Sequence, residues 1–191
     1  MGRNTPAKVS YRALTVLALV AVGGFAVDQI SKALVVNSMI EGETARVLGD
    51  VLQLHFIRNP GAAFSFATGL TWVFSLIAAG VVVFVVWFAP RIRSRLWAIV
   101  FGLLLGGVLG NLTDRLFREP SFGLGHVVDF IYTPWMMPAI YNVADCCIVV
   151  SMVLFMLLSL RGIGLDGRRT PASEPAAAAP VDAPASLVTP N

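Results

Sequence analysis

The chain has 191 residues, of which 57% are hydrophobic and 13% are charged, and its mean hydropathy is +0.77. This balance excludes an ordinary soluble domain and indicates an integral membrane protein. The net charge is +3, but the basic residues cluster beside apolar runs, which fits anionic lipid headgroups better than nucleic acid. The only cysteines, Cys146 and Cys147, are adjacent in an apolar run and provide neither a disulfide framework nor metal-ligand spacing.

Four apolar stretches are long enough to cross a bilayer, and we expect a mainly α membrane fold with spans at residues 13–36, 71–88, 96–112 and 139–160. A span needs about 20 largely apolar residues, because each backbone polar group must be satisfied within the segment. Asp28 and Lys32 closely follow the first apolar run, and no small-residue cleavage site leads into a soluble chain. The first run is therefore expected to be a retained span rather than a removable signal.

The third span carries glycine at every fourth position, at Gly102, Gly106 and Gly110. Overlapping small-residue patterns of this kind let another helix approach closely. We interpret these glycines as a packing surface rather than as part of a catalytic site, because glycine supplies no reactive group.

Basic residues predict the orientation of the spans. Nine of the fourteen Lys and Arg residues fall on one side, at Arg3, Lys8, Arg12, Arg91, Arg93, Arg95, Arg161, Arg168 and Arg169. Cytoplasmic flanks of membrane spans are enriched in such residues. Both termini are therefore expected in the cytoplasm, and the two long connections, residues 37–70 and 113–138, on the outer side.

The regions outside the spans divide into an outer loop structure and a tail. Residues 51–57 mix apolar alternation with aromatic residues after a Leu-Gly-Asp turn, which favours a strand or hairpin and a small β-containing extracytoplasmic sheet. We expect residues 1–162 to form the four-helix membrane domain and residues 163–191 an Ala/Pro-rich cytoplasmic tail. Residues 170–191 are too poor in apolar surface to fold and are expected to be disordered.

Four acidic residues lie in or against the apolar spans, namely Asp28, Asp114, Asp129 and Asp145. Charged groups are costly inside a membrane, so each of them is a candidate functional residue. With the predicted orientation, each falls near the outer end of a helix or in the adjoining loop. The four acids should therefore lie at one depth.

Two of these acids have a basic neighbour, and structural roles compete with functional ones. Asp28 and Lys32 are four residues apart on a helix and form either an ion pair or part of the site. Asn111 and Asp114 share a helix face, and Arg115 is the expected counter-ion of Asp114. We favour a structural ion pair for Asp114 and Arg115, because an arginine keeps a carboxylate ionised and makes it a poor proton donor.

Asp129 and Asp145 are the better catalytic candidates. Asp129 has apolar neighbours on both sides, in a loop approaching the fourth span. Asn142 and Asp145 are three residues apart at the start of that span and can face one interior site. For a lone aspartate at a helix start, a capping role is the usual interpretation, but the apolar setting of both acids argues against it here.

Two close carboxylates share a proton, so one can activate water as general base while the other protonates a peptide group. The sequence motifs that other classes of protease require are absent. His55 and His126 are not in an H-E-x-x-H pattern, and no G-x-S-x-G or S-x-x-K motif occurs. No metal-ligand set has a plausible spacing, so we expect neither a metal nor another cofactor.

Five sequence blocks in order, within residues 28–151, resemble those of bacterial lipoprotein signal peptidase, also called signal peptidase II. The blocks are Asp28-Gln-x-Ser-Lys32, Arg58-Asn-Pro-Gly-Ala-Ala-Phe-Ser65, Gly106-Gly-x-x-Gly-Asn-x-x-Asp-Arg115, Val127-Val-Asp-Phe130 and Tyr141-Asn-Val-Ala-Asp145. The chain departs from the family pattern at Pro60, where threonine is frequent, and in its long tail. Neither departure touches a carboxylate.

The resemblance implies an aspartic endopeptidase with Asp129 and Asp145 as the catalytic pair. It also implies supporting or substrate-binding roles for Asp28, Lys32, Asn59, Gly61, Asn111, Asp114, Arg115 and Asn142. The implied substrate is a prolipoprotein cut just before a diacylglyceryl-modified cysteine. A monomer in the lipid of the bacterial cytoplasmic membrane is expected, with the active site near the outer face. Residues 47–66 would cover the site, with Phe64 at the lipid interface.

Three other functions stay open at the level of sequence. A proton-coupled transporter would place acids near the middle of the bilayer and show an inverted repeat, which we do not find. A purely structural subunit would use the glycines of the third span but leaves Asp129 and Asp145 unexplained. A presenilin-type protease would share the chemistry, but its G-x-G-D pattern is absent, since His126 follows Gly125.

Overall fold

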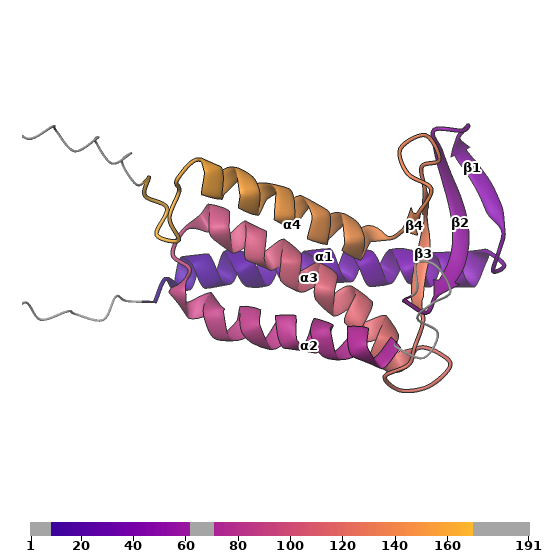
Figure 1. Ribbon diagram of the computed structural model, residues 1–191, viewed down its shortest axis with the longest axis horizontal. Helices are drawn as coiled ribbons and strands as arrows, with labels where there is room; N and C mark the ends of the chain where they lie inside the picture. Colours follow the sequence, from indigo (N-terminus) through magenta and orange to yellow (C-terminus); the bar gives the residue numbers. More distant parts are fainter. Residues whose placement is uncertain (1–8, 62–70, 170–191) are drawn as a thin grey trace, which may run out of the picture.

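The computed structural model describes residues 9–61 and 71–169, and within these ranges four helices lie side by side in a bundle (Figure 1). They are α1 Tyr11–Ser38, α2 Thr71–Phe88, α3 Arg95–Phe117 and α4 Val143–Leu160, with a short 3-10 helix, η1 Ala89–Arg91, after α2. Each of the four is long and apolar enough to cross a membrane. The four predicted spans are therefore confirmed as helices.

Two helices differ from the predicted bounds by more than two residues at one end. Helix α3 continues five residues beyond residue 112 to Phe117, because the polar residues of its last turns have partners inside the protein. Helix α4 begins at Val143 rather than at residue 139. Asn142 directly precedes the helix and caps it, accepting a hydrogen bond from the backbone N–H of Asp145. The Asp145 side chain accepts in turn from the backbone N–H of Asn142, so the capping role that the sequence analysis argued against for Asp145 is present.

Helix α3 lies at the centre of the bundle and contacts the other three. The glycines on α3 make this possible. A Cβ at Gly106 would lie 2.6 Å from the carbonyl oxygen of Ala21 on α1, and one at Gly107 would lie 2.5 Å from that of Ala144 on α4. The predicted packing role is confirmed for Gly102 and Gly106 against α1, while Gly107, which the sequence pattern did not single out, approaches α4.

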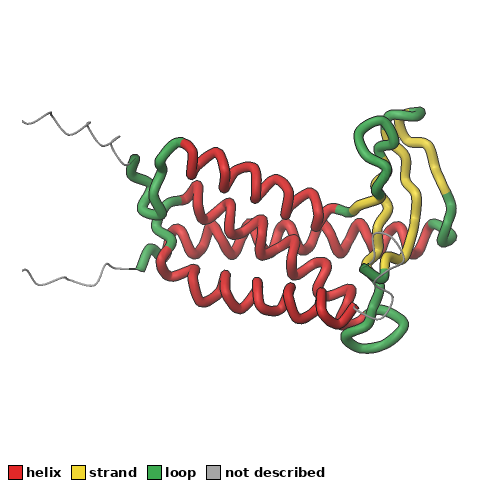
Figure 2. Tube along the Cα trace, in the orientation of Figure 1, coloured by secondary structure: helices red, strands yellow, loops and turns green. Residues whose placement is uncertain are grey.

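A four-stranded antiparallel sheet covers one end of the bundle, opposite the end where both described chain ends lie (Figures 1 and 2). Its strands, in sheet order, are β1 Thr44–Leu48, β2 Leu52–Asn59, β3 Val127–Tyr132 and β4 Ile140–Tyr141. The predicted hairpin is thus confirmed as β1 and β2. The segment around Asp129, expected as a loop, is instead strand β3, because the apolar residues beside Asp129 pack with Phe56 and Val35 under the sheet.

The opposite end of the bundle is closed by residues just after α4. Trp97 donates from its ring N–H to the carbonyl of Ile163 (3.0 Å), and the carbonyl of Leu165 accepts from the backbone of Arg93 and Ser94. Residues 163–165, which were expected in the tail, thus pack against the start of α3. Residues 170–191 of the expected tail, and Phe64 with the rest of 62–70, lie outside the described residues.

Candidate active site

Asp129 lies on β3 with its side chain turned into the protein, and it is only 2% exposed. Each of its carboxylate oxygens accepts one amide hydrogen bond. Asn59, the last residue of the neighbouring strand β2, donates to Oδ2 (2.8 Å), and Asn142 donates to Oδ1 (2.6 Å). The antiparallel pairing of β2 with β3 brings Asn59 beside this carboxylate.

Asp145 lies in the first turn of α4, at the same end of the bundle as the sheet. Its Oδ2 accepts from the backbone N–H of Asn142 (3.1 Å), and its Oδ1 accepts from the side-chain amide of Asn111 on α3 (2.8 Å). Two N–H donors and the helix N-terminus thus stabilise negative charge on this carboxylate.

Asn142 is the residue that joins the two carboxylates. Its side chain is fully buried, its backbone N–H is bonded to Asp145, and its amide nitrogen is bonded to Asp129. The same amide nitrogen also donates to Oδ1 of Asn111 (3.1 Å). The structure therefore brings Asp129 and Asp145, which are sixteen positions apart in the sequence, to one polar site under the sheet.

Burial raises the pKa of Asp129 from 3.8 to about 6. The hydrogen bond from Asn59 acts in the opposite direction, and the nearby charge of Asp145 adds to the rise. Asp129 therefore keeps its proton to a higher pH than an exposed aspartate does.

Beneath this site, Lys32 on α1 joins two further acids. Its Nζ lies 2.9 Å from Oδ2 of Asp28 and 2.7 Å from Oδ2 of Asp114, and all three side chains are 0% exposed. The Nζ also donates to Oδ1 of Asn111 (3.0 Å), which continues the network to Asp145. The expected pairing of Asp28 with Lys32 is thus present, within a larger buried ion cluster.

The two acids of this cluster fasten other elements to α1. Oδ1 of Asp28 accepts from the backbone N–H of Ala144 at the start of α4 (2.9 Å). Oδ2 of Asp114 accepts from the backbone N–H of Val128 on β3 (3.3 Å). The cluster therefore holds the elements that carry Asp145 and Asp129 in place.

The expected ion pair between Asp114 and Arg115 is wrong. Asp114 pairs instead with Lys32 and with Arg118, whose Nε lies 2.6 Å from its Oδ1. The reason is helical geometry, because adjacent residues on a helix point in different directions whereas residues four apart share a face. Arg118 and its spacing of four from Asp114 were readable in the sequence but were not singled out.

Arg115 is consequently free of Asp114. Its guanidinium lies over the ring of Phe74 on α2, 5.3 Å from the ring centroid, and its Nη1 is buried without a hydrogen-bond partner among the described residues. Gly61 lies beside it. A Cβ at Gly61 would be 3.0 Å from that Nη1 and 2.9 Å from the Phe74 ring.

Gly61 also has a backbone role, since its φ of +98° is unfavourable for other residues. Its N–H donates to Oδ1 of Asn59 (2.8 Å), which turns the amide nitrogen of Asn59 toward Asp129.

Gln29 was not singled out for the site, although it belongs to the first of the five sequence blocks. Its amide nitrogen donates to Asp28 and to the carbonyl of Gly110 (3.1 Å each). Apart from Arg115, the residues predicted for the site are thus joined in one network of hydrogen bonds and ion pairs.

Within residues 9–61 and 71–169, no three His, Cys, Asp or Glu side chains are grouped closely enough to hold a metal ion.

Comparisons with known proteins agree with one family. The model of the family described as signal peptidase (SPase) II matches residues 20–161. The chain is 64% identical over 162 residues to a lipoprotein signal peptidase of Leifsonia xyli subsp. xyli, covering 85% of this chain and 74% of that protein. It is 43% identical over 168 residues to one of Rhodococcus jostii, covering 88% and 84%.

Solved structures show the same fold. A bacterial membrane enzyme determined by the in meso method at 2.3 Å matches with a TM-score of 0.66 and 24% identity, over 83% of this chain and 94% of that one. A second, at 1.9 Å, matches with a TM-score of 0.66 and 25% identity, over 81% and 97%. This chain is therefore a multi-pass bacterial membrane protein and belongs to the signal peptidase II family of proteases.

Proposed function

We propose that this chain is an aspartic endopeptidase that removes signal peptides from prolipoproteins with a diacylglyceryl-modified cysteine. Asp129 and Asp145 are the proposed catalytic pair. The observation that carries this proposal is Asn142, which hydrogen-bonds both carboxylates and so places two acids from different elements at one site. Membership of the signal peptidase II family supports the reaction, and the relatives named lipoprotein signal peptidase support the substrate.

In the proposed reaction, Asp145 is the general base. It takes a proton from a water molecule, whose oxygen attacks the carbonyl carbon of the scissile peptide bond, while Asp129 gives its proton to the carbonyl oxygen. The resulting gem-diol collapses when Asp145 passes its proton to the leaving nitrogen and Asp129 recovers its own. The C–N bond breaks, leaving a carboxylic acid on the signal peptide, which then releases its proton to water, and a free amine on the cysteine.

The assignment of acid and base follows from the surroundings of each carboxylate. The pKa of Asp129 is raised by burial to about 6, so this group holds a proton near neutral pH more readily than an exposed aspartate. Asp145 accepts hydrogen bonds from two N–H donors at a helix N-terminus, which leave lone pairs of its carboxylate oxygens available to take a proton from water.

Arg115 is proposed to bind the substrate backbone. Buried donors in proteins are nearly always satisfied, and the Nη1 of Arg115 is buried without a partner among the described residues. Gly61 lies beside it, and a Cβ at this position would press against both Phe74 and Arg115. A peptide carbonyl of the substrate would satisfy this donor, which makes Arg115 a binding residue, whereas Asp28, Lys32 and Asp114 act as supports.

An apolar cavity beside Asp145 suits the lipid of the substrate. It has a volume of about 340 Å³, and its lining includes Asp145, Met137, Val149 and Val150. The two valines are 61% and 48% exposed on the face of α4 that would meet lipid. The diacylglyceryl group is attached to the cysteine next to the scissile bond. The binding site for this group must therefore lie beside the proposed catalytic pair, as this cavity does.

The orientation of the site follows from charge. The end of the bundle opposite the sheet carries Arg12, Arg91, Arg93, Arg95, Arg161, Arg168 and Arg169. The excess of arginine on one side supports a cytoplasmic location for both termini and an outer location for the sheet and the catalytic pair. We further propose that the membrane domain acts as a monomer.

The test is cleavage of a synthetic prolipoprotein peptide by the purified full-length chain in detergent. With a diacylglyceryl group on the cysteine, mass spectrometry should find a single cut immediately before that cysteine. The matched control is the same peptide with an unmodified cysteine, which should remain uncut. Equal cleavage of both peptides would refute the lipid requirement, and a folded enzyme that cuts neither would refute the proposed function.

A further inference from the structure

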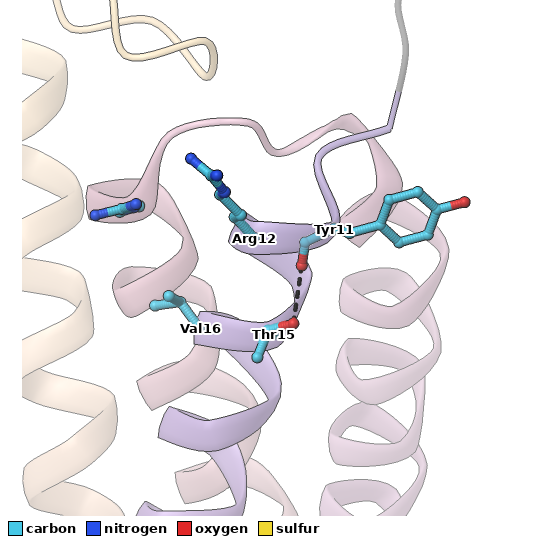
Figure 3. Close-up of a pocket in the computed structure, with 5 residues that line it drawn as sticks. Tyr11, Arg12, Thr15 and Val16 are labelled. Carbon is cyan, nitrogen blue, oxygen red and sulfur yellow. Dashed lines mark hydrogen bonds between the residues drawn. The ribbon is translucent and has the colours of Figure 1, made fainter.

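A second cavity lies at the end of the bundle opposite the sheet, far from the proposed active site. It has a volume of about 460 Å³ and is lined by Tyr11, Arg12, Thr15 and Val16 of α1 and by Arg95 of α3 (Figure 3). Two helices thus contribute one arginine each to the same cavity.

Neither arginine of this cavity has a protein partner. Within the described part of the chain, the side chains of Arg12 and Arg95 make no hydrogen bond and no ion pair, and both are exposed. Arg91, one residue after Pro90, differs, because it donates to the carbonyl of Trp87 and stacks on the Trp87 ring at 3.9 Å. Two cationic groups that share a cavity repel each other unless an anion lies between them.

The surroundings offer little negative charge. Among the described residues at this end, the one carboxylate is Asp166, and it lies 4.0 Å from Arg168. The Thr15 hydroxyl donates to the carbonyl of Tyr11 (3.0 Å), and the Tyr11 ring points away from Arg12 (Figure 3). The two guanidinium groups are therefore the free hydrogen-bond donors of the cavity.

The cavity opens at the level where the apolar surface of the spans begins. Leu19, two turns along α1 from Arg12, is 68% exposed, and Leu96, next to Arg95, is 51% exposed. Such leucines face lipid tails in a membrane. A ligand with an anionic head and an apolar tail fits both the arginines and the surface beside them.

We propose that Arg12 and Arg95 form a binding site for the phosphate-bearing headgroup of an anionic phospholipid, in the leaflet opposite the active site. Guanidinium groups bind phosphate oxygens by paired, charge-assisted hydrogen bonds. The signal peptide of a substrate does not fit this cavity, because its N-terminal region is itself positively charged. The site does not depend on the proposed catalytic chemistry.

The experiment measures lipid retention by the full-length protein in a neutral detergent, by native mass spectrometry, during titration with phosphatidylglycerol or phosphatidylcholine. The test variant is Arg12→Gln with Arg95→Gln. The matched control is Arg93→Gln with Arg161→Gln, which removes the same charge from the same end but from two exposed arginines that do not line the cavity. Inorganic phosphate is added in a separate arm as competitor.

We expect the test variant to lose about tenfold or more in affinity for phosphatidylglycerol, with the control within about twofold of the unaltered chain. Phosphatidylcholine should bind weakly to all three proteins. An equal loss in test and control variants would overturn the site in favour of diffuse attraction. Displacement of the lipid by millimolar phosphate would overturn the assignment to a lipid. Cleavage of the peptide substrate, measured in the same preparations, separates this result from the test of catalysis.

Discussion

The two ends of the bundle differ in whether their charged side chains are buried and paired. At the sheet end, Asp28, Lys32 and Asp114 are fully buried, and each is paired. At the other end, Arg12 and Arg95 are exposed and have no partner among the described residues. A buried charge is tolerated only with partners, so the first set must be assembled by the fold, whereas the second is free to meet a ligand. The following predictions test this contrast, from the largest expected effect to the smallest.

The largest effect should come from the proposed catalytic pair. Asp129→Asn and Asp145→Asn should each lower turnover of the diacylated peptide by about a thousandfold or more, because asparagine keeps the shape but cannot exchange a proton. The double variant should be scarcely worse than either single one, since the two groups act as a unit.

The control for that experiment is Asp114→Asn, measured with the same peptide and with thermal unfolding in the same detergent. It should reduce stability and only partly reduce turnover, because Asp114 supports the site through Lys32 and Arg118. If Asp129→Asn keeps near-normal turnover while Asp114→Asn abolishes it in folded protein, the catalytic pair has been assigned to the wrong residues.

Removing the central charge of the buried cluster should affect folding most. Lys32→Met leaves Asp28 and Asp114 buried without their shared partner and should cost about 3–5 kcal/mol of stability. Arg93→Gln, an exposed arginine at the opposite end, should change stability by less than about 0.5 kcal/mol. Thermal unfolding of the two variants measures the loss of stability at each end of the bundle. Equal losses would contradict the proposed difference between buried, paired charges and exposed, unpaired ones.

The pH dependence of stability should report the burial of Asp129. Its pKa is raised to about 6 in the folded protein, so between pH 4 and 6 the folded state binds more protons than the unfolded state. Stability is then lost as pH rises through this window, by about 3 kcal/mol at most from this group. The variant Asp129→Asn lacks this carboxyl group. Its unfolding midpoint should therefore rise relative to that of the unaltered chain as the pH increases from 4 to 6. A constant difference across the window would show that the carboxylate has an ordinary pKa.

The smallest expected effect concerns helix packing between the two ends. Gly106→Ala places a methyl group 2.6 Å from the Ala21 carbonyl and should cost about 1–3 kcal/mol through displacement of α1. Gly80→Ala on α2 is the matched control, because nothing lies within 4 Å of its added methyl group. The control should be neutral or slightly stabilising, as alanine favours the helix. Equal unfolding midpoints for the two variants would refute the close approach of α1 to α3.

Much of the fold was predictable because the membrane imposes length on each span. The bounds of α2 match residues 71–88, where an uncharged apolar run begins and ends sharply. The start of α4 was missed because Ala139, Ile140 and Tyr141 are apolar and resemble the helix that follows. Ile140 and Tyr141 pair with β3 instead, and this pairing depends on tertiary structure that no local pattern contains.

The acids of the site were readable as charges in apolar surroundings, but their connections were not. The bond from Asn142 to Asp129 joins residues of different elements, and neither spacing nor composition predicts it. The partner of Asp114 was predictable in principle, since Arg118 lies four residues further along one helix. Arg115 was chosen as the partner of Asp114 because the two residues are adjacent in the sequence. Its side chain turns toward Phe74 instead.

Asn142 has a consequence for how this protein matures in the membrane. It caps α4 and also holds Asp129, so the start of that helix and the link between the two carboxylates form from one residue. Asp129 arrives only when β3 docks beside β2. A newly inserted chain with all four helices in the bilayer but an unformed sheet would therefore have separated carboxylates. With the proposed catalytic pair apart, such a chain would not yet cleave neighbouring membrane proteins during its biogenesis.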